Sequence, residues 1–415
     1  MLRTHILNNT LWSRVFKGTA TTVSAIALSL VLSTGYAHAD AQFRKWVSGF
    51  RPVAMQNGIA PSTFDRAFAG VNEIDPEVLQ KARFQPEFTT PVWDYIDNRV
   101  NEHSIGTGQV MAKKWGKALT AIEKQYGVDR NILLAIWSME TGYGEMMKRP
   151  DVMRDAIRSL ATLAYADQRR AKYARNQLIA AMKILQTGDI DRSHLSGSWA
   201  GAMGHTQFIP TSYQAYAVDF DGNGKRDIWN SVPDALATAA NLLRKNGWEP
   251  GRTWGYEVVL PASGKFPSGS LSIGEWRRLG LVRANGRAFP SDSEKATLKV
   301  MDGRNGPVFL MTKNFFVIKR YNNADTYALG VGMLADRIAG YSGLVRDWNR
   351  PFTPISMKER EELQGHLRAL GYYDGKIDGK IGSSSRKAIE AFQQRNGLQS
   401  DGHPSKEVLG VLRRR

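Results

Sequence analysis

The sequence is organised around the stretch W-S-M-E-T-G-Y-G at residues 137–144. Asp129 is a helix-capping residue type, and the run 130–137 after it places Ile132 and Ile136 on one apolar face at helical spacing. Glu140 falls on that same face. Gly142 is suited to end the helix, because glycine readily adopts the left-handed conformation found at helix C-termini. The stretch therefore predicts a buried helix that carries a carboxylate near its end.

A carboxylate on an apolar face is buried, paired or directed into a cleft. Burial raises the pKa of a carboxyl group, because the charged form loses its hydration. A glutamate that stays protonated near neutral pH can donate a proton to a leaving oxygen. Glu140 is thus a candidate general acid, and the alternative is a glutamate at a helix end that faces solvent.

Composition bounds the classes of protein to consider. The chain has 415 residues, of which 42% are hydrophobic, so one to three domains with large cores are expected. The formal charge is +17, which suits an anionic partner such as nucleic acid, a membrane surface or an acidic polymer. There are no cysteines, which excludes disulfides, thiolate zinc sites and a lipid-modified cysteine.

The first 39 residues are typical of a secretory signal. Positive charges at Arg3, Arg14 and Lys17 precede an apolar run over 23–32, and A-H-A at 37–39 matches a cleavage site. We expect cleavage after Ala39 and an exported protein without a membrane anchor; a retained anchor is the alternative.

Beyond the signal the chain reads as mainly helical. Apolar residues recur at helical spacing over 43–50, after Pro61, from Trp93 to Tyr126, and over 156–185. The segment 196–210, S-G-S-W-A-G-A-M-G-H-T-Q-F-I-P, is too rich in glycine and alanine for an ordinary helix. Its small residues imply close backbone approach, either to a ligand or to another element.

The segment 219–227, D-F-D-G-N-G-K-R-D, fits the first nine positions of a calcium loop. Position 12 is Asn230 where a bidentate glutamate is usual, although Asp234 follows on the next helix. A turn without metal is the alternative. The candidate ligands are Asp219, Asp221, Asn223, Lys225 through its carbonyl, Asp227 and Asp234.

The C-terminal half changes character. A helix is predicted over 231–246, then short strands over 256–260, 296–301, 308–311 and 315–318, then a helix over 328–339. A Pro-containing linker precedes a unit of some sixty residues, enough for a small three-helix domain. Its two halves share a plan in which an apolar helix accompanies a D-G turn.

Several motifs, found in this order, resemble the lytic murein transglycosylase B family, and the resemblance covers about residues 40–350. The C-terminal unit, with G-Y-Y-D-G-K-I-D-G at 371–379, looks like a peptidoglycan-binding domain. The motifs that carry the first resemblance are E-T-G-Y-G at 140–144, D-Q-R-R at 167–170, S-W-A-G-A-M-G-H-T-Q-F-I-P at 198–210, D-F-D-G-N-G at 219–224 and R-Y-N-N at 320–323.

The resemblance implies a mainly α (α+β) fold: a lysozyme-like helical catalytic domain with a small β-containing insert, followed by a three-helix domain. Together with the signal and the linker read from the residues, the expected segments are a signal peptide over 1–39, a catalytic domain over 40–350, a linker over 351–358 and a peptidoglycan-binding domain over 359–415. The implied reaction cleaves the MurNAc–GlcNAc β-1,4 bond and leaves a 1,6-anhydro ring on MurNAc.

By the same resemblance, Glu140 is the catalytic residue, protonating the leaving oxygen and then accepting the proton of the C6 hydroxyl. The implied substrate-binding residues are Ser198, Gln207, Tyr321, Asn322, Tyr327, Arg169, Arg170 and Tyr95. The chemistry then requires no cofactor, and Ca²⁺ would be structural.

The expected partners are peptidoglycan glycan strands and other cell-wall enzymes, with a monomer in the periplasm. Nucleic acid is disfavoured, because no nucleic-acid motif accompanies the positive charge. A hydrolytic muramidase with the same acid and a non-catalytic wall-binding scaffold are the competing hypotheses.

Overall fold

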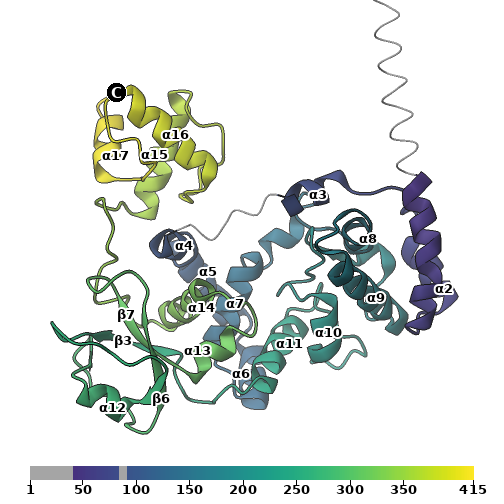
Figure 1. The fold of residues 1–415 in the computed structure, drawn as a ribbon, viewed down its shortest axis with the longest axis horizontal. Coiled ribbons are helices and arrows are strands. Elements are labelled where there is room, and N and C mark those ends of the chain that lie inside the picture. The colour runs from purple at the N-terminus through teal and green to yellow at the C-terminus, as the bar shows by residue number, and fades with distance from the viewer. Residues whose placement is uncertain (1–40, 84–90) are drawn as a thin grey trace, which may run out of the picture.

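The computed structural model describes residues 41–83 and 91–415, and its architecture is mainly helical with one small sheet (Figure 1). The predicted fold class is confirmed. The expected signal over 1–39 lies outside the described residues. Along the described ranges, no helix combines the length and the apolar character needed to cross a bilayer.

Helices make up most of the large N-terminal part, which begins with a helix over residues 41–56. The further helices are α2 (Pro61–Phe68), α3 (Pro76–Arg83), α4 (Val92–Arg99), α5 (Glu102–Lys114), α6 (Gly116–Tyr126), α7 (Arg130–Thr141), α8 (Ala156–Ala166), α9 (Ala171–Thr187), α10 (Pro210–Tyr216), α11 (Val232–Lys245), α13 (Lys313–Ile318) and α14 (Asp325–Ile338). The helix expected over 156–185 is two helices, because the Asp167 side chain accepts hydrogen bonds from the backbone of Arg169 and Arg170 and turns the chain there.

Helix α7 is the centre of the core, as its sequence predicts. The Asp129 side chain accepts a hydrogen bond from the Asn131 N–H at 2.6 Å and caps the helix start. Gly142, at φ 58° and ψ 48°, ends the helix in the left-handed conformation. Ile132, Leu133, Ile136 and Trp137 are all buried. Helices α5, α11 and α14 pack around α7, so its last turn is held from several sides.

The insert is a five-stranded antiparallel sheet with its own core. Its elements are β3 (Gly255–Val259), β4 (Ser270–Ser272), α12 (Ile273–Arg278), β5 (Val282–Arg283), β6 (Lys295–Val300) and β7 (Val308–Thr312), and the strand order is β4-β6-β7-β3-β5. Trp276 is fully buried under the sheet and donates its indole N–H to the Ala296 carbonyl at 2.8 Å.

One predicted strand is wrong. Residues 315–318 form part of helix α13, which buries Phe315, Val317 and Ile318. A short apolar run does not distinguish a buried strand from a buried helix turn. The helix is favoured here by Asn314, whose side chain donates to the carbonyls of Glu249 and Arg252 and so anchors the helix start.

The C-terminal unit has three helices, α15 (Met357–Ala369), α16 (Ser383–Arg395) and α17 (Lys406–Leu412), around a separate core. In each of its two halves, a glutamine side chain holds a D-G turn by hydrogen bonds. Gln364 accepts hydrogen bonds from the backbone N–H groups of Asp378 and Gly379, and Gln393 does the same for Asp401 and Gly402. The segment boundaries expected at 350 and 358 stay a prediction.

Helix α4 joins the C-terminal unit to the rest of the molecule (Figure 1). Asp97 accepts from Arg350 at 2.8 Å and Arg360 at 2.7 Å, and Asp94 pairs with Arg386 at 2.5 Å. Asn98 exchanges two hydrogen bonds with the backbone of Ile381. The C-terminal unit is therefore docked on helix α4 through both ion pairs and hydrogen bonds.

Candidate active site

Glu140 lies in the last turn of α7 and is partly buried. Its Oε1 accepts a hydrogen bond from the Tyr327 hydroxyl at 2.7 Å. Burial raises the pKa of Glu140 to about 7, against the opposing effects of the Tyr327 hydrogen bond and the positive charge of Arg99. A carboxyl group with that pKa can both donate and accept a proton near neutral pH.

Two stacked tyrosines form one side of the site. The rings of Tyr321 and Tyr327 lie 6.4 Å apart and nearly parallel, at 9°. Tyr321 donates its hydroxyl to the Thr206 carbonyl, and Phe208 meets its ring edge-on at 5.4 Å. Burial raises the pKa of both tyrosines well above the usual value, so they remain hydrogen-bond donors.

Helix α14 reaches Glu140 because Gly330 allows it to lie close to α7. A Cβ at Gly330 would stand 2.5 Å from Met139 Cε and 3.4 Å from Tyr95 Cε1. Tyr95, on α4, is near enough to Glu140 for the carboxylate charge to raise its pKa further, after burial. Arg99 donates to the Met139 carbonyl at 3.1 Å and lies over the Tyr95 ring at 5.7 Å. The structure thus gathers Tyr95, Tyr321 and Tyr327 around Glu140.

The glycine-rich segment 196–210 is hydrogen-bonded to the C-terminal end of α7. Its first residues form β2 (Ser196–Gly197), which pairs with β1 (Arg154–Asp155). Thr141 donates its hydroxyl to the His205 carbonyl at 2.6 Å, and Trp137 donates its indole N–H to His205 Nδ1 at 3.2 Å. Thr141 and His205 were not predicted as site residues, and the one signal for them in the sequence was their place inside the motifs at 140–144 and 198–210.

The small residues of this segment were expected to allow close approach either to a ligand or to another element. At Gly204 the close approach is to another element. A Cβ there would stand 2.5 Å from the Ile228 carbonyl oxygen, and φ is 67°. Gln207 also has a positive φ, 50°, which is uncommon outside glycine. Its amide donates to the Gly204 carbonyl at 2.9 Å, and Ser198 Oγ accepts from the Ala202 N–H at 3.2 Å. Both candidate side chains therefore shape the loop that carries them.

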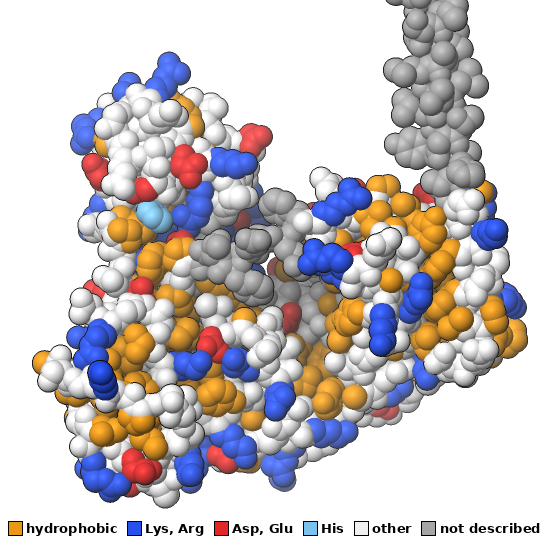
Figure 2. Space-filling view, in the orientation of Figure 1, with side chains coloured by type: hydrophobic (Ala, Val, Ile, Leu, Met, Phe, Trp, Pro, Cys, Tyr) orange, Lys and Arg blue, Asp and Glu red, His pale blue; other side chains and the backbone are white. Residues whose placement is uncertain are grey.

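The remaining candidates lie further out. Arg170 pairs with Asp167 at 2.7 Å and lies over the Trp199 ring at 5.8 Å, so it contacts the start of the glycine-rich segment. Arg169 is exposed at the turn between α8 and α9, and Asn322 is exposed beside Tyr321. Neither side chain hydrogen-bonds to Glu140 in the described part of the chain. Figure 2 shows a hollow in this face of the molecule between the α8–α9 side and the α14 side.

The loop 219–227 brings carboxylates together at the start of α11. Ligand-type oxygens of Asp219, Asp221 and Asp234 lie within 4.8 Å of one another. Asp234, which is buried, accepts from the N–H groups of Phe220 and Asp227. The side chain of Asn223 accepts from the Lys225 N–H, and that of Asp227 from the Trp229 N–H. Asp234, on the next helix, thus joins two carboxylates of the loop in one cluster, and the oxygen donor set suits Ca²⁺.

Comparison with known proteins identifies the family. Residues 42–336 match the family model described as "Transglycosylase SLT domain", and residues 356–412 match "Putative peptidoglycan binding domain". The chain is 32% identical over 263 residues to membrane-bound lytic murein transglycosylase B of Escherichia coli (strain K12), covering 62% of this chain and 67% of that protein.

Solved structures agree. SltB3 from Pseudomonas aeruginosa in complex with NAG-anhNAM-pentapeptide is 46% identical, with a TM-score of 0.71 over 89% of this chain and 99% of that one. Slt35 of Escherichia coli in complex with calcium is 28% identical, with a TM-score of 0.56 over 64% and 84%. The predicted resemblance is confirmed, and the chain belongs to the SLT-domain family of lytic murein transglycosylases, enzymes that cleave the glycosidic bonds of peptidoglycan.

Proposed function

We propose that this lytic transglycosylase cleaves the MurNAc–GlcNAc β-1,4 bond with Glu140 as its only acid and base. Protonated Glu140 gives its proton to the glycosidic oxygen as the C1–O4 bond breaks. The resulting carboxylate then takes the proton of the MurNAc C6 hydroxyl while O6 bonds to C1. No water is added, so the products are a GlcNAc hydroxyl and a 1,6-anhydro-MurNAc end.

The observation that carries this proposal is the 2.7 Å hydrogen bond from the Tyr327 hydroxyl to Glu140, at a position where burial raises the Glu140 pKa to about 7. Glycosidases that use water pair two carboxylates across the bond. The charge that shifts the Glu140 pKa within the described residues is Arg99, a cation, and not a second acid. A single group that both gives and takes a proton matches an internal hydroxyl nucleophile.

The sugar-binding roles are proposed for the residues around and beyond Glu140. Tyr95, Tyr321 and Tyr327 supply aromatic faces and hydroxyls, and Ser198, Gln207 and Asn322 supply neutral hydrogen-bonding groups, as sugar sites require. Arg169 and Arg170 are suited to carboxylates of the substrate. SltB3 was crystallised in complex with NAG-anhNAM-pentapeptide and with NAG-NAM-pentapeptide, which supports the same substrate class here.

We propose a structural Ca²⁺ site at Asp219, Asp221, Asn223, the Lys225 carbonyl and Asp234, with Asp227 fixing the end of the loop. Its support is the carboxylate cluster and the calcium complex of Slt35. The ion would hold the loop between α10 and α11. The cleavage steps assigned to Glu140 do not involve it.

The rest of the proposal concerns the setting of the enzyme. The signal over 1–39 would direct it to the periplasm and be removed after Ala39. There it would act as a monomer on glycan strands, alongside other cell-wall enzymes. The domain matched over 356–412 would keep it on the wall by raising its effective concentration there.

The test is mass spectrometry of muropeptides released from purified peptidoglycan. The wild type is expected to give products one water lighter than hydrolytic ones and resistant to borohydride. Glu140→Gln is expected to lower turnover at least 1,000-fold, the scale of losing a general acid. The matched control is Glu145→Gln, an exposed neighbour paired with Lys148.

Reducible products would instead assign the hydrolytic muramidase activity. Wall binding without any product from the wild type would favour the scaffold. Full turnover by Glu140→Gln would remove Glu140 from the mechanism.

A further inference from the structure

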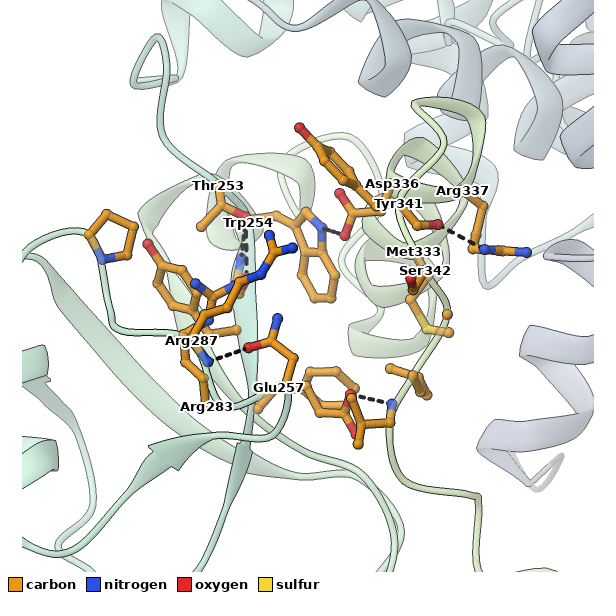
Figure 3. Close-up of a pocket in the computed structure, with 18 of the residues that line it drawn as sticks. Thr253, Trp254, Glu257, Arg283, Arg287, Met333, Asp336, Arg337, Tyr341 and Ser342 are labelled. Carbon is orange, nitrogen blue, oxygen red and sulfur yellow. Dashed lines mark hydrogen bonds between the residues drawn. The ribbon is translucent and has the colours of Figure 1, made fainter.

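A second cavity lies at the opposite end of α14 from Tyr327. It has a volume of about 740 Å³ and is enclosed by β3, the loop after β5, the end of α14 and the segment 340–345 (Figure 3). Asp336, which lines it, follows Tyr327 by nine residues, which is about 14 Å along a helix that rises 1.5 Å per residue. Glu140 does not line this cavity, so it is separate from the proposed catalytic centre.

The walls are fixed by hydrogen bonds within the protein. Trp254 is buried and donates its indole N–H to Asp336 Oδ2 at 3.0 Å. Phe309 packs beside Trp254 at 5.9 Å. Both oxygens of Glu257 accept backbone N–H groups, from Val345 at 2.8 Å and Arg346 at 2.9 Å, and so hold the segment after Gly340 against β3. Tyr341, which is 64% exposed, and the small exposed part of Trp254, 6% of its surface, give the cavity an aromatic wall.

Four arginines line the cavity, and two of them are committed to the protein. Arg283 lies over the Tyr256 ring at 5.1 Å and donates to the Ala288 carbonyl, and Arg337 donates to the Tyr341 carbonyl at 2.8 Å. In the described part of the chain, the guanidinium groups of Arg252 and Arg287 make no hydrogen bond or ion pair. Figure 3 shows the Arg287 side chain extending into the cavity towards Trp254.

Two acids, Glu257 and Asp336, also line the cavity, but neither forms an ion pair with Arg252 or Arg287 in the described part of the chain. Glu257 is occupied by backbone N–H groups. Asp336 is bound to Trp254, and burial raises its pKa to about 6, which makes it a weak counter-charge in mildly acidic conditions. The cavity therefore presents two guanidinium groups that have no partner among the described residues, next to an aromatic wall. Its volume of about 740 Å³ has room for a ligand far larger than a simple anion.

We propose that this cavity binds a carboxylate-bearing peptide stem of peptidoglycan, with Arg252 and Arg287 on its carboxylates and Trp254 and Tyr341 against its aliphatic parts. The choice of polymer rests on the proposed function. Guanidinium groups bind carboxylates through paired N–H donors, and an aromatic wall suits the aliphatic side chains and methyl groups of a short peptide. The enzyme thereby recognises the peptide as well as the glycan of its substrate.

The first test measures binding of a free stem pentapeptide, without sugar, to the full chain carrying Glu140→Gln, by calorimetry. Adding Arg252→Gln and Arg287→Gln is expected to weaken the peptide at least tenfold. The matched control adds Lys265→Gln and Arg278→Gln, two exposed cations of the same insert that do not line the cavity, and should keep the affinity. A pentapeptide with amidated carboxyl groups is expected to bind the unmodified cavity as weakly as the acid peptide binds the arginine variant.

The proposal would be overturned if the arginine variant and the control variant bound the peptide equally well. It would also be overturned if the chain carrying Glu140→Gln alone did not bind the peptide. Because this binding assay involves no bond cleavage, failure of the Glu140 mechanism leaves its result unchanged. A second measurement shows which glycan strand carries the bound peptide stem. It compares the KM of the wild type and of the Arg252→Gln, Arg287→Gln variant, both with Glu140 intact, on glycan with and without peptide stems. If the arginine variant has a raised KM for stem-bearing glycan but not for stem-free glycan, the bound stem belongs to the strand being cut. If its KM is unchanged but it is retained more weakly on whole wall, the bound stem belongs to a neighbouring strand.

Discussion

The proton affinity of Glu140 is set by two opposing environments. Removal from water favours the neutral acid, whereas the Tyr327 hydroxyl and the Arg99 charge favour the carboxylate. The first effect is larger, so the pKa rises to about 7 and not further. The role proposed for Glu140, to give a proton and then take one back, benefits from this balance, because neither form is strongly preferred.

Tyr327→Phe should shift this balance in a defined direction. The lost hydrogen bond stabilised the carboxylate, so the pKa of Glu140 should rise above about 7. Since the protonated form starts the reaction, the alkaline limb of the kcat/KM profile should move to higher pH. We also expect kcat to fall about 10- to 100-fold, because a hydrogen bond to a charged group contributes about 1.5–3 kcal/mol. The measurement is the pH–rate profile, with Tyr173→Phe on an exposed face of α9 as control.

An alkaline limb that stays in place, or moves to lower pH, would contradict this role for Tyr327. A fall in kcat with no shift of the limb would leave Tyr327 as a packing residue only.

Among the elements, those whose ends carry strong local signals were predictable. Asp129 and Gly142 define α7 from sequence alone, and they act in the structure as expected. The apolar run 315–318 carries no such signal, and its helix depends on Asn314 contacting carbonyls about sixty residues earlier. The Tyr327–Glu140 contact likewise joins residues 187 apart, so only the family resemblance indicated it.

The loop between α10 and α11 yields an element-scale prediction. Three carboxylates within 4.8 Å repel one another, so a bound cation should stabilise the fold. At 100 times its Kd, Ca²⁺ should add about 2.7 kcal/mol and raise the thermal midpoint by several degrees. Asp219→Asn with Asp221→Asn should abolish the rise seen by calorimetry, whereas Asp191→Asn, an exposed acid outside the loop, should not.

Glycan cleavage should persist in a chelator below the unfolding temperature, since Glu140 does not need the ion. An unchanged midpoint in saturating Ca²⁺ would argue that the loop is held by its own hydrogen bonds.

At the scale of the whole molecule, α4 connects two functions. One set of its side chains, Asp94, Asp97 and Asn98, holds the C-terminal domain, whereas Tyr95 borders Glu140. The pairs join residues more than 250 positions apart, and Asp97 contacts Arg350 and Arg360 together. No periodicity or motif relates such distant residues, so this joint was not predictable from the sequence. Its consequence is a fixed distance between the C-terminal domain and Glu140, the proposed acid.

Asp97→Asn tests that joint. It would leave Arg350 and Arg360, both largely buried, without their carboxylate, at a cost of about 3 kcal/mol. The C-terminal domain has its own core, so it should detach folded and not unfold. Small-angle scattering should then give a larger radius of gyration. The KM for whole peptidoglycan should rise severalfold, with kcat on short glycan unchanged, because Glu140 and its tyrosines are untouched.

Asp65→Asn, which removes an exposed pair with Arg51, is the matched control and should leave both quantities as in the wild type. A detached domain with an unchanged KM would mean that tethering alone retains the enzyme on the wall and that the fixed geometry contributes nothing to turnover.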